Sequence, residues 1–428
     1  MNYKKAEIKQ GITLHNINTD KFKTNLITVF LTVPISRENV TFNSMISSIL
    51  RRGSKNMPTQ EIISKTMEEM YGASFNNGVD KIGNNHILKF HLESINDEYL
   101  PQDDENMLKK SMKKLFEIVF NPYLESGKFK EEYVNQEKQA VSQRIDAKID
   151  NKATYARTRC VECMYKDDPA ALYKYGYVED MEGINSENLY NYYQTLIETC
   201  KIDIFVSGKN EMEDIINILN ENENISLLKG RKANYVINDI KIEKEKPEQT
   251  VIEKQSVNQG KVVIGCDILF DENDLKDENL RYEALVYNGL LGGSANSKLF
   301  QNVREKASLA YTASSNYVRF KSNIFINAGI EIENYDKAIK IIREQLKSME
   351  KGEFTEEEIE NEKKSIISGI DFIDDEQDGG IVYYFGQEIL GTNVDLEEYK
   401  QRIKSVNKEQ VLNIAKKVKV NTIYFLRN

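Results

Sequence analysis

Residues 290–311 read LLGGSANSKLFQNVREKASLAY, and parts of this stretch recur earlier in the chain. The string LLGGS (290–294) corresponds to LRRGS (50–54), and YTAS (311–314) corresponds to YGAS (71–74). Both matches have the same offset of 240 residues. Two separate matches at one offset indicate an internal duplication. The sequence therefore predicts two similar domains.

Strand and helix patterns alternate along both halves of the chain. Apolar β-branched runs predict strands at 23–35 and 201–208, a strand pair is expected around 73–95, and periodic patterns predict helices at 39–52, 59–72, 105–120 and 128–151. We expect an N-terminal domain at 1–228, a charged linker at 229–258 and a C-terminal domain at 259–428. The predicted fold class is α+β, with an antiparallel-rich sheet covered by helices in each domain.

Composition limits the classes of function. The chain has 428 residues, 40% of them hydrophobic and 29% charged, with a net charge of −10. The acidic balance argues against nucleic-acid binding through a basic surface. No stretch approaches the roughly 20 apolar residues of a membrane span, and the N-terminal lysines are not followed by the apolar run of a secretory signal. We therefore expect a cytoplasmic protein.

The cysteines and histidines offer little catalytic chemistry. Cys160 and Cys163 form a C-x-x-C within a predicted helix, and no second pair completes a structural zinc site, so we expect packing cysteines. Of only three histidines, His15 stands alone in a predicted strand. His86 and His91 lie five residues apart on another strand and should point to opposite faces. A peptidase acting by itself through a histidine base is thus unsupported.

The stretch that follows the glycine pair carries the most specific signal. Gly292 and Gly293 predict a helix end, a second helix follows, and a strand should begin near Tyr311. This string resembles the C-terminal-domain signature of the insulinase/pitrilysin family of inverted-zinc peptidases. The matching positions are Gly292, Gly293, Ser297, Leu299, Phe300, Arg304, Glu305 and Tyr311. The resemblance implies two insulinase-like α/β-roll domains.

The resemblance also shows what the first half lacks. Catalytic members carry H-x-x-E-H on the helix before the RGS-like turn, with two zinc ligands and a general base. Those positions fall on Ser44, Ser47 and Ser48, and the third ligand falls on Asn135. Hydroxyls and a neutral amide are poor substitutes for imidazole and carboxylate ligands. We therefore expect no metal and no other cofactor in this chain, although zinc is expected in a partner subunit.

The same helix, residues 39–52, can also be interpreted as an ordinary packing helix. Met45, Ile46, Ile49 and Leu50 would form an apolar face, and the serines would be small residues that line a vacated site. At the offset of 240 residues, the corresponding positions in the second half are Ala284, Tyr287 and Asn288, which also lack metal ligands.

Arg304 and Tyr311 are the remaining candidates for function. In two-subunit members of the family, the zinc-less subunit supplies an arginine and a tyrosine that contact the substrate, and the resemblance places them at these two positions. A guanidinium is a planar, permanently charged donor that can hold a peptide carbonyl or a developing oxyanion. The alternative is that Arg304 pairs with a nearby carboxylate and Tyr311 only packs.

The predicted function is therefore that of a non-catalytic subunit. The chain would form half of a clamshell chamber in a heterodimer with a zinc-bearing paralogue, and would present Arg304 and Tyr311 to a peptide or small protein substrate. The alternative function is a homodimeric pseudopeptidase that binds peptides or scaffolds other proteins without hydrolysis. Retention of Arg304 and Tyr311 favours the first function, because a pure scaffold would not need both.

Overall fold

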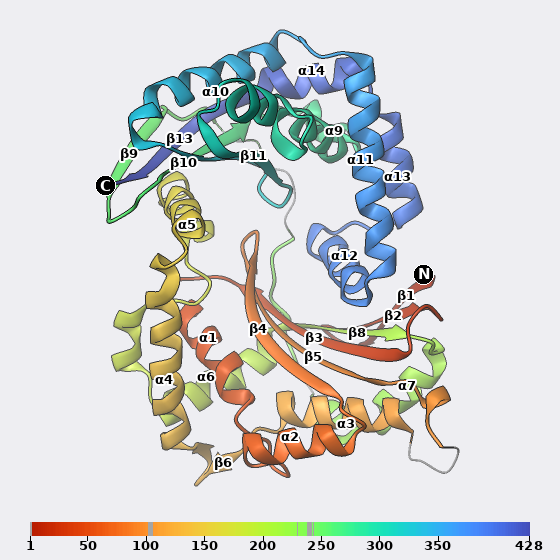
Figure 1. The fold of residues 1–428 in the computed structure, drawn as a ribbon. Helices are drawn as coiled ribbons and strands as arrows, with labels where there is room; N and C mark the ends of the chain where they lie inside the picture. The colour runs from red at the N-terminus through yellow and green to blue at the C-terminus, as the bar shows by residue number, and fades with distance from the viewer. Residues whose placement is uncertain (1, 102–105, 229, 238–241, 243) are drawn as a thin grey trace. The chain divides into compact units, whose positions relative to one another are not determined.

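The chain forms two compact units, each built around one main β-sheet (Figure 1). The computed structural model describes residues 2–101, 106–228, 230–237, 242 and 244–428. Unit 1 comprises the chain up to Asp146, then Leu172–Ile237 and Ile373–Ile389. Unit 2 comprises Ala147–Ala171, Asn238–Phe372 and Leu390–Asn428. The α+β class predicted from the sequence is confirmed.

Unit 1 contains a six-stranded sheet of order β1-β2-β8-β3-β5-β4, in which only the β2–β8 pair is parallel. Its strands are β1 (Asn2–Lys9), β2 (Ile12–Asn18), β3 (Thr24–Pro34), β4 (Ser74–Ile82), β5 (Asn85–Ile95) and β8 (Lys201–Gly208), with a small β6–β7 hairpin (Leu124–Glu125 and Lys128–Phe129). Its helices are α1 (Val40–Leu50), α2 (Gln60–Glu69), α3 (Met107–Phe120), α4 (Glu131–Asp146), α6 (Ser186–Thr199), α7 (Met212–Glu221), α8 (Glu223–Ser226) and α12 (Gln377–Leu390).

Strand β3 is buried on both faces because helices cover both sides of the sheet. Val29 and Leu31 join the core beneath α1, α3 and α6, whereas Phe30 points to the opposite face. On that opposite face Phe30 stacks on Phe385 of α12 with ring centroids 3.8 Å apart. A strand covered on both faces reads as a continuous apolar run, which explains the pattern of residues 23–35.

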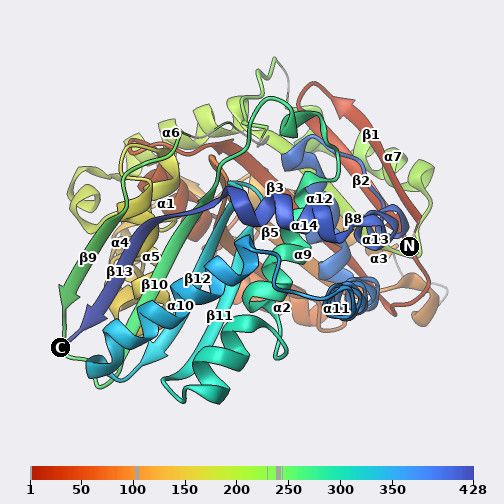
Figure 2. The ribbon, with the colours of Figure 1, turned by 90° about the horizontal axis from the view of Figure 1, so that it is seen from above.

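Unit 2 contains a five-stranded sheet of order β11-β12-β10-β13-β9, in which only the β13–β9 pair is parallel. Figure 2 shows these strands side by side with α10 lying across them. The strands are β9 (Gln249–Lys254), β10 (Gly260–Ile268), β11 (Ala310–Val318), β12 (Asn323–Ile330) and β13 (Val418–Arg427). The helices are α5 (Lys152–Met164), α9 (Leu280–Asn288), α10 (Tyr335–Glu350), α11 (Glu356–Asp375), α13 (Leu396–Ser405) and α14 (Lys408–Lys417), and two π-helical turns span Gly289–Gly293 and Phe300–Lys306.

The duplication is visible in equivalent details of the two units. In both sheets the last strand, β8 or β13, pairs in parallel with one neighbour and antiparallel with another. The helix before that strand begins in both cases with a capping box, formed by Asn185 in unit 1 and Asn407 in unit 2. Such a cap satisfies two free N–H groups at the start of a helix.

The units divide the chain differently from the boundaries predicted from sequence. Residues 147–171, placed by prediction in the domain 1–228, belong to unit 2, because α5 buries Ala156, Cys160 and Met164 against the unit 2 sheet. Residues 373–389, placed by prediction in the domain 259–428, belong to unit 1. Contiguous boundaries cannot represent helices that leave their own half of the chain to pack on the sheet of the other half.

The predicted linker 229–258 also differs from a simple connection. It contains β9 (QTVIEK), an edge strand that pairs with β13 and carries Glu253 and Lys254 at its end. Residues 229, 238–241 and 243 of that linker lie outside the described residues. Edge strands tolerate charged side chains, so this strand has a weak sequence signal.

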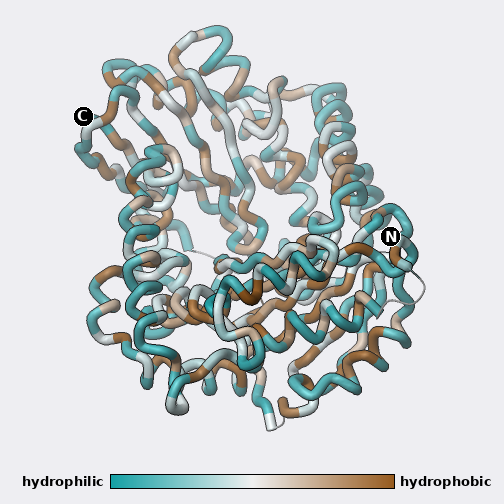
Figure 3. Tube along the Cα trace, turned by 60° about the horizontal axis from the view of Figure 1, so that its bottom comes forward, coloured by the Kyte–Doolittle hydropathy of each residue, from teal (hydrophilic) through white to brown (hydrophobic). Residues whose placement is uncertain are grey.

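Hydropathy follows the layers of each unit. Figure 3 shows hydrophobic residues along the strands of the sheets, while the helices alternate between hydrophobic and hydrophilic positions. Within the part of the chain that the structure describes, no helix combines the length and apolar character needed to cross a bilayer. Cys160, Cys200 and Cys266 are buried free thiols and Cys163 is half-buried, which confirms the interpretation of packing cysteines.

Candidate functional site

The three serines predicted at the metal positions lie together on α1 and are buried. Ser44, Ser47 and Ser48 are 1%, 2% and 3% exposed, next to the apolar face predicted for this helix. The Ser47 hydroxyl donates to the Gly78 carbonyl of strand β4 at 3.2 Å, and Asn77 donates to the Ser47 carbonyl at 2.6 Å. Ser47 therefore joins α1 to the edge strand β4. The Ser44 hydroxyl has no hydrogen-bond partner among the described residues.

A neutral polar network lies beside these serines. The side-chain amide of Asn43 on α1 bonds through its nitrogen to Nδ1 of His86 on β5 at 3.1 Å, and Tyr192 donates to Oδ1 of the same amide at 2.7 Å. The other nitrogen of His86 bonds to the Lys174 carbonyl at 2.9 Å. Burial lowers the pKa of His86 to about 4, so this imidazole is neutral near pH 7. His91 faces the other side of the sheet, near Asp378 of α12, as predicted.

Asn135, predicted at the third ligand position, is exposed on α4, whose buried positions are Val134, Glu137 and Val141. Glu137 instead points inward and forms an ion pair with Arg52, which follows α1. The structure therefore brings Glu137, and not Asn135, to the end of the serine-bearing helix.

The donor set around the serines does not fit zinc. Zinc in proteins is bound by imidazole, thiolate or carboxylate ligands, whereas α1 offers three neutral hydroxyls. One of them, Ser47, already donates its proton to a backbone carbonyl. Glu137 is already paired with Arg52. The assignment of these positions to a lost metal site stays a prediction.

Arg304 lies on the π-helical turn Phe300–Lys306 in unit 2. Its side chain is 44% exposed and lies 3.7 Å from the Glu305 carboxylate. Its guanidinium carbon lies 4.5 Å from the centroid of the Phe300 ring. Ser308, with φ of 53°, then turns the chain toward β11, and its N–H bonds to the Arg304 carbonyl. The local carboxylate pairing expected under the alternative interpretation does exist, but it is long and exposed, and such pairs contribute little to stability.

Tyr311 does not pack in the core. The pairing of β11 with β12 shifts between Ala310 and Thr312, so Tyr311 occupies a β-bulge. Its side chain is 64% exposed, and its hydroxyl donates to Glu331 at 3.0 Å. A bulge re-aims a side chain away from the regular strand pattern. Arg304 and Tyr311 are thus both exposed on one short segment, and each has its own carboxylate neighbour.

Sequence reasoning missed a buried charged cluster in unit 1, on the sheet face that α12 covers. His15 bonds through Nε2 to Asp203 at 3.0 Å, and Tyr3 bonds to its Nδ1 at 2.8 Å. Lys201 lies 2.7 Å from Asp203 and 3.2 Å from Glu388 of α12. The only sequence signal was polar residues in buried strands. Although His15, Asp203 and Glu388 are close enough to share a metal ion, Lys201 already supplies the cation, so the cluster does not fit one.

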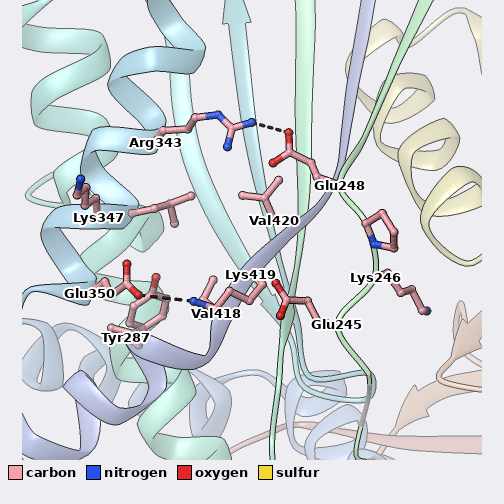
Figure 4. A pocket seen from close by; sticks show the side chains of 13 residues that line it. Glu245, Lys246, Glu248, Tyr287, Arg343, Lys347, Glu350, Val418, Lys419 and Val420 are labelled. Carbon is pink, nitrogen blue, oxygen red and sulfur yellow. Dashed lines mark hydrogen bonds and ion pairs between the residues drawn. The ribbon is translucent and has the colours of Figure 1, made fainter.

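A groove of about 660 Å³ on unit 2 is lined by the segment 245–248, by α10 and by the start of β13 (Figure 4). Arg343 pairs with Glu248 at 2.5 Å across it, and Lys419 pairs with Glu350 at 3.5 Å. Tyr287, at a position equivalent to Ser47, lies in its wall fully buried, and its hydroxyl has no hydrogen-bond partner among the described residues. The groove is a surface of paired charges without a convergent catalytic set.

Comparison with known proteins agrees with this geometry. The family description "Peptidase M16 inactive domain" matches residues 183–366. The chain is 34% identical to the "Probable inactive metalloprotease YmfF" of Bacillus subtilis over 97% of its own length and 96% of that protein. It is 27% identical to the "Uncharacterized zinc protease YmfH" of the same organism over 51% of this chain and 50% of that protein.

Solved structures show the same fold. A conserved protein from Enterococcus faecalis V583 matches with a TM-score of 0.87 and 27% identity, covering 100% of this chain and 99% of that one. A peptidase M16 inactive domain from Pseudomonas fluorescens matches with a TM-score of 0.80 and 15% identity, covering 100% of this chain and 98% of that one.

Fold and site together define a duplicated, metallopeptidase-like protein of the inactive type. The chain belongs to the M16 family, the insulinase/pitrilysin peptidases.

Proposed function

We propose that this chain is the non-catalytic subunit of a heterodimeric, cytoplasmic zinc peptidase. A zinc-bearing M16 paralogue would supply the metal and the general base, and this chain would supply half of the chamber together with Arg304 and Tyr311 as substrate-binding residues. The observation that carries the proposal is the exposure of both side chains on the 304–311 segment, one of them at a β-bulge.

The chemistry of the two side chains suits a peptide substrate. The guanidinium of Arg304 can donate to peptide carbonyls and keeps its charge at any pH near neutrality. The Tyr311 hydroxyl now donates to Glu331, and a substrate carbonyl could take that place. Two similar proteins in B. subtilis, one named as an inactive metalloprotease and one as a zinc protease, support a pairing between such relatives.

The test mixes the purified chain with a zinc-bearing M16 paralogue from the same genome. Peptide cleavage should require both chains, and Arg304→Ala or Tyr311→Phe should reduce kcat/KM at least tenfold without weakening the complex. Arg343→Ala is a matched control, because Arg343 is 45% exposed on unit 2 and forms an ion pair of its own. Full activity of both variants would exclude a substrate-binding role.

A second function is a homodimeric pseudopeptidase that binds peptides without cleaving them. The support is the edge strand β4, which pairs on one side with β5 and lies at the end of the sheet. A groove of about 520 Å³ lined by α2 and the start of β4 lies beside this edge. An extended peptide can add to such an edge. Analytical ultracentrifugation separates the two functions, because a stable dimer of this chain alone favours the second.

A further inference from the structure

Two buried glutamates occupy equivalent places in the duplicated units. Glu137 on α4 and Glu362 on α11 each precede a lysine, and they are 5% and 8% exposed. Lys138 donates to the Ile184 carbonyl at 2.9 Å, and Lys363 donates to the Lys404 carbonyl at 3.0 Å. In both units the lysine thus bonds to a carbonyl just before the helix that begins with a capping box, α6 or α14, so the two Glu-Lys pairs have matching surroundings.

The glutamates differ in what neutralises them. Glu137 pairs with Arg52, but the residue that matches Arg52 at the offset of 240 is Gly292, which has no side chain. No ion pair joins Glu362 to another residue in the described part of the chain, and burial raises its pKa. The Ser294 hydroxyl bonds to its carboxyl group. An ionised carboxyl that is buried without a cation is costly, so the surroundings of Glu362 favour its neutral form.

The Glu362 carboxyl group lies directly against the π-helical turn Gly289–Gly293. A Cβ atom at Gly289 would lie 2.2 Å from the Oε1 atom of Glu362, so the carboxyl group keeps this position only while residue 289 has no side chain. On its other side the turn contacts β11, since a Cβ at Gly292 would lie 2.5 Å from the Ser315 nitrogen and 2.8 Å from Leu299. Glu362 therefore packs against the turn, and the turn packs against β11 and against Leu299, which directly precedes the Phe300–Lys306 segment.

We propose that Glu362 is a positioning residue that sets the conformation of the segment 289–306 and thereby the presentation of Arg304. The carboxyl group fills the space left by Gly289 and accepts from Ser294, so it fixes both ends of the glycine turn. Its role differs from that of Glu137, which forms an ion pair. The part of this proposal that concerns substrate rests on the proposed function above.

A double-mutant cycle between Gly289 and Glu362 tests the contact by hydrogen exchange of segment 289–306. Glu362→Ala and Gly289→Ala should each speed exchange about tenfold, because each removes or displaces a buried hydrogen-bonding group. The double variant should recover most of the protection, since the new methyl group occupies the vacated space. Equal effects of Gly289→Ala with and without Glu362 would overturn the proposal.

Two further variants make the result specific. Glu362→Gln keeps the shape and an acceptor for Ser294, so it should keep wild-type exchange. Glu137→Ala, the change in unit 1 that matches Glu362→Ala, should leave the exchange of 289–306 unchanged; an increase as large as that caused by Glu362→Ala would mean general destabilisation and would refute the positioning role. If Glu362→Ala loosens the segment while Arg304→Ala keeps full activity with the paralogue, the proposed function fails and the positioning role stands.

Discussion

Phe385 of α12 stacks on Phe30 of β3, with ring centroids 3.8 Å apart and ring planes 9° apart, although the two residues come from opposite halves of the chain. Tyr384 makes a similar stack on Tyr3 of β1 at 3.8 Å. At the start of α12, Gln377 donates to the carbonyls of Thr24 and Ser207. A helix from the C-terminal half therefore completes the core of unit 1.

We expect Phe385→Ala to destabilise the protein by about 3–5 kcal/mol, because the change deletes a buried ring and leaves a cavity. Phe385 is 2% exposed. Chemical denaturation monitored by circular dichroism measures the effect. Val382→Ala, a change at a 50% exposed position of the same helix, is the control and should stay within about 0.5 kcal/mol. If Phe385→Ala and Val382→Ala lower the free energy of unfolding equally, α12 does not contribute to the core of unit 1.

The charged cluster beneath α12 should also be essential for stability. Asp203 is fully buried and accepts from His15 and Lys201, so Asp203→Ala removes the carboxylate partner of His15 and leaves Lys201 paired only with Glu388. Breaking a buried pair in this way costs about 3–5 kcal/mol. Lys21→Ala, which breaks an exposed pair with Asp374, should cost less than about 1 kcal/mol.

A metal titration tests the interpretation of the same cluster. Because Lys201 already bridges Asp203 and Glu388, added zinc or manganese should leave the Tm of the wild-type protein unchanged. Lys201→Ala removes the internal cation, so any metal-dependent stabilisation should appear only in that variant. A metal-dependent rise of Tm in the wild-type protein would contradict the interpretation that Lys201 is the cation of this cluster.

Glu283 should make unit 2 sensitive to pH. This carboxyl on α9 is 1% exposed, and burial together with Asp277 raises its pKa from 4.5 to about 7. The folded state therefore holds this proton more tightly than the unfolded state, and the contribution to stability is greatest below pH 4.5 and is lost as the pH rises toward 7. Glu283→Gln should remove this component between those pH values. Chemical denaturation at several pH values measures the free energy of unfolding of both proteins. If the difference between wild type and Glu283→Gln does not change with pH, the raised pKa of Glu283 is refuted.

The two capping boxes provide a matched test of the duplication. Asn185 caps α6 and Asn407 caps α14, each with reciprocal bonds to the third helical residue. Replacing an Asn cap by alanine costs about 1 kcal/mol. We therefore expect Asn185→Ala and Asn407→Ala to lower the free energy of unfolding by similar amounts, whereas Asn191→Ala in the interior of α6 should have a smaller effect. A much larger loss at only one cap would show that the two helices are not equivalent.

Local sequence patterns predicted the elements around the candidate site correctly. The run 23–35 predicted β3, the stretch 39–52 predicted α1, and the glycine pair predicted the end of α9 and the start of β11 near Tyr311. These predictions succeed because apolar periodicity and glycine turns depend on neighbours within a few residues. The sequence did not predict the π-helical turns or the bulge at Tyr311, since both depend on contacts between strands and helices.

The sequence by itself determined the α+β class and the duplication, and it predicts that Ser44, Ser47 and Ser48 stand where the family has zinc ligands. Those features follow from local periodicity and from residue identity. Only the tertiary structure decided that α5 and α12 cross to the other half's sheet, that His15 and Asp203 share a buried charge cluster, and that Glu362 is buried without an ion pair among the described residues. The physical reason is that burial and charge pairing are set by residues distant in sequence. The exposure of Arg304 and Tyr311 was likewise decided only by the tertiary structure.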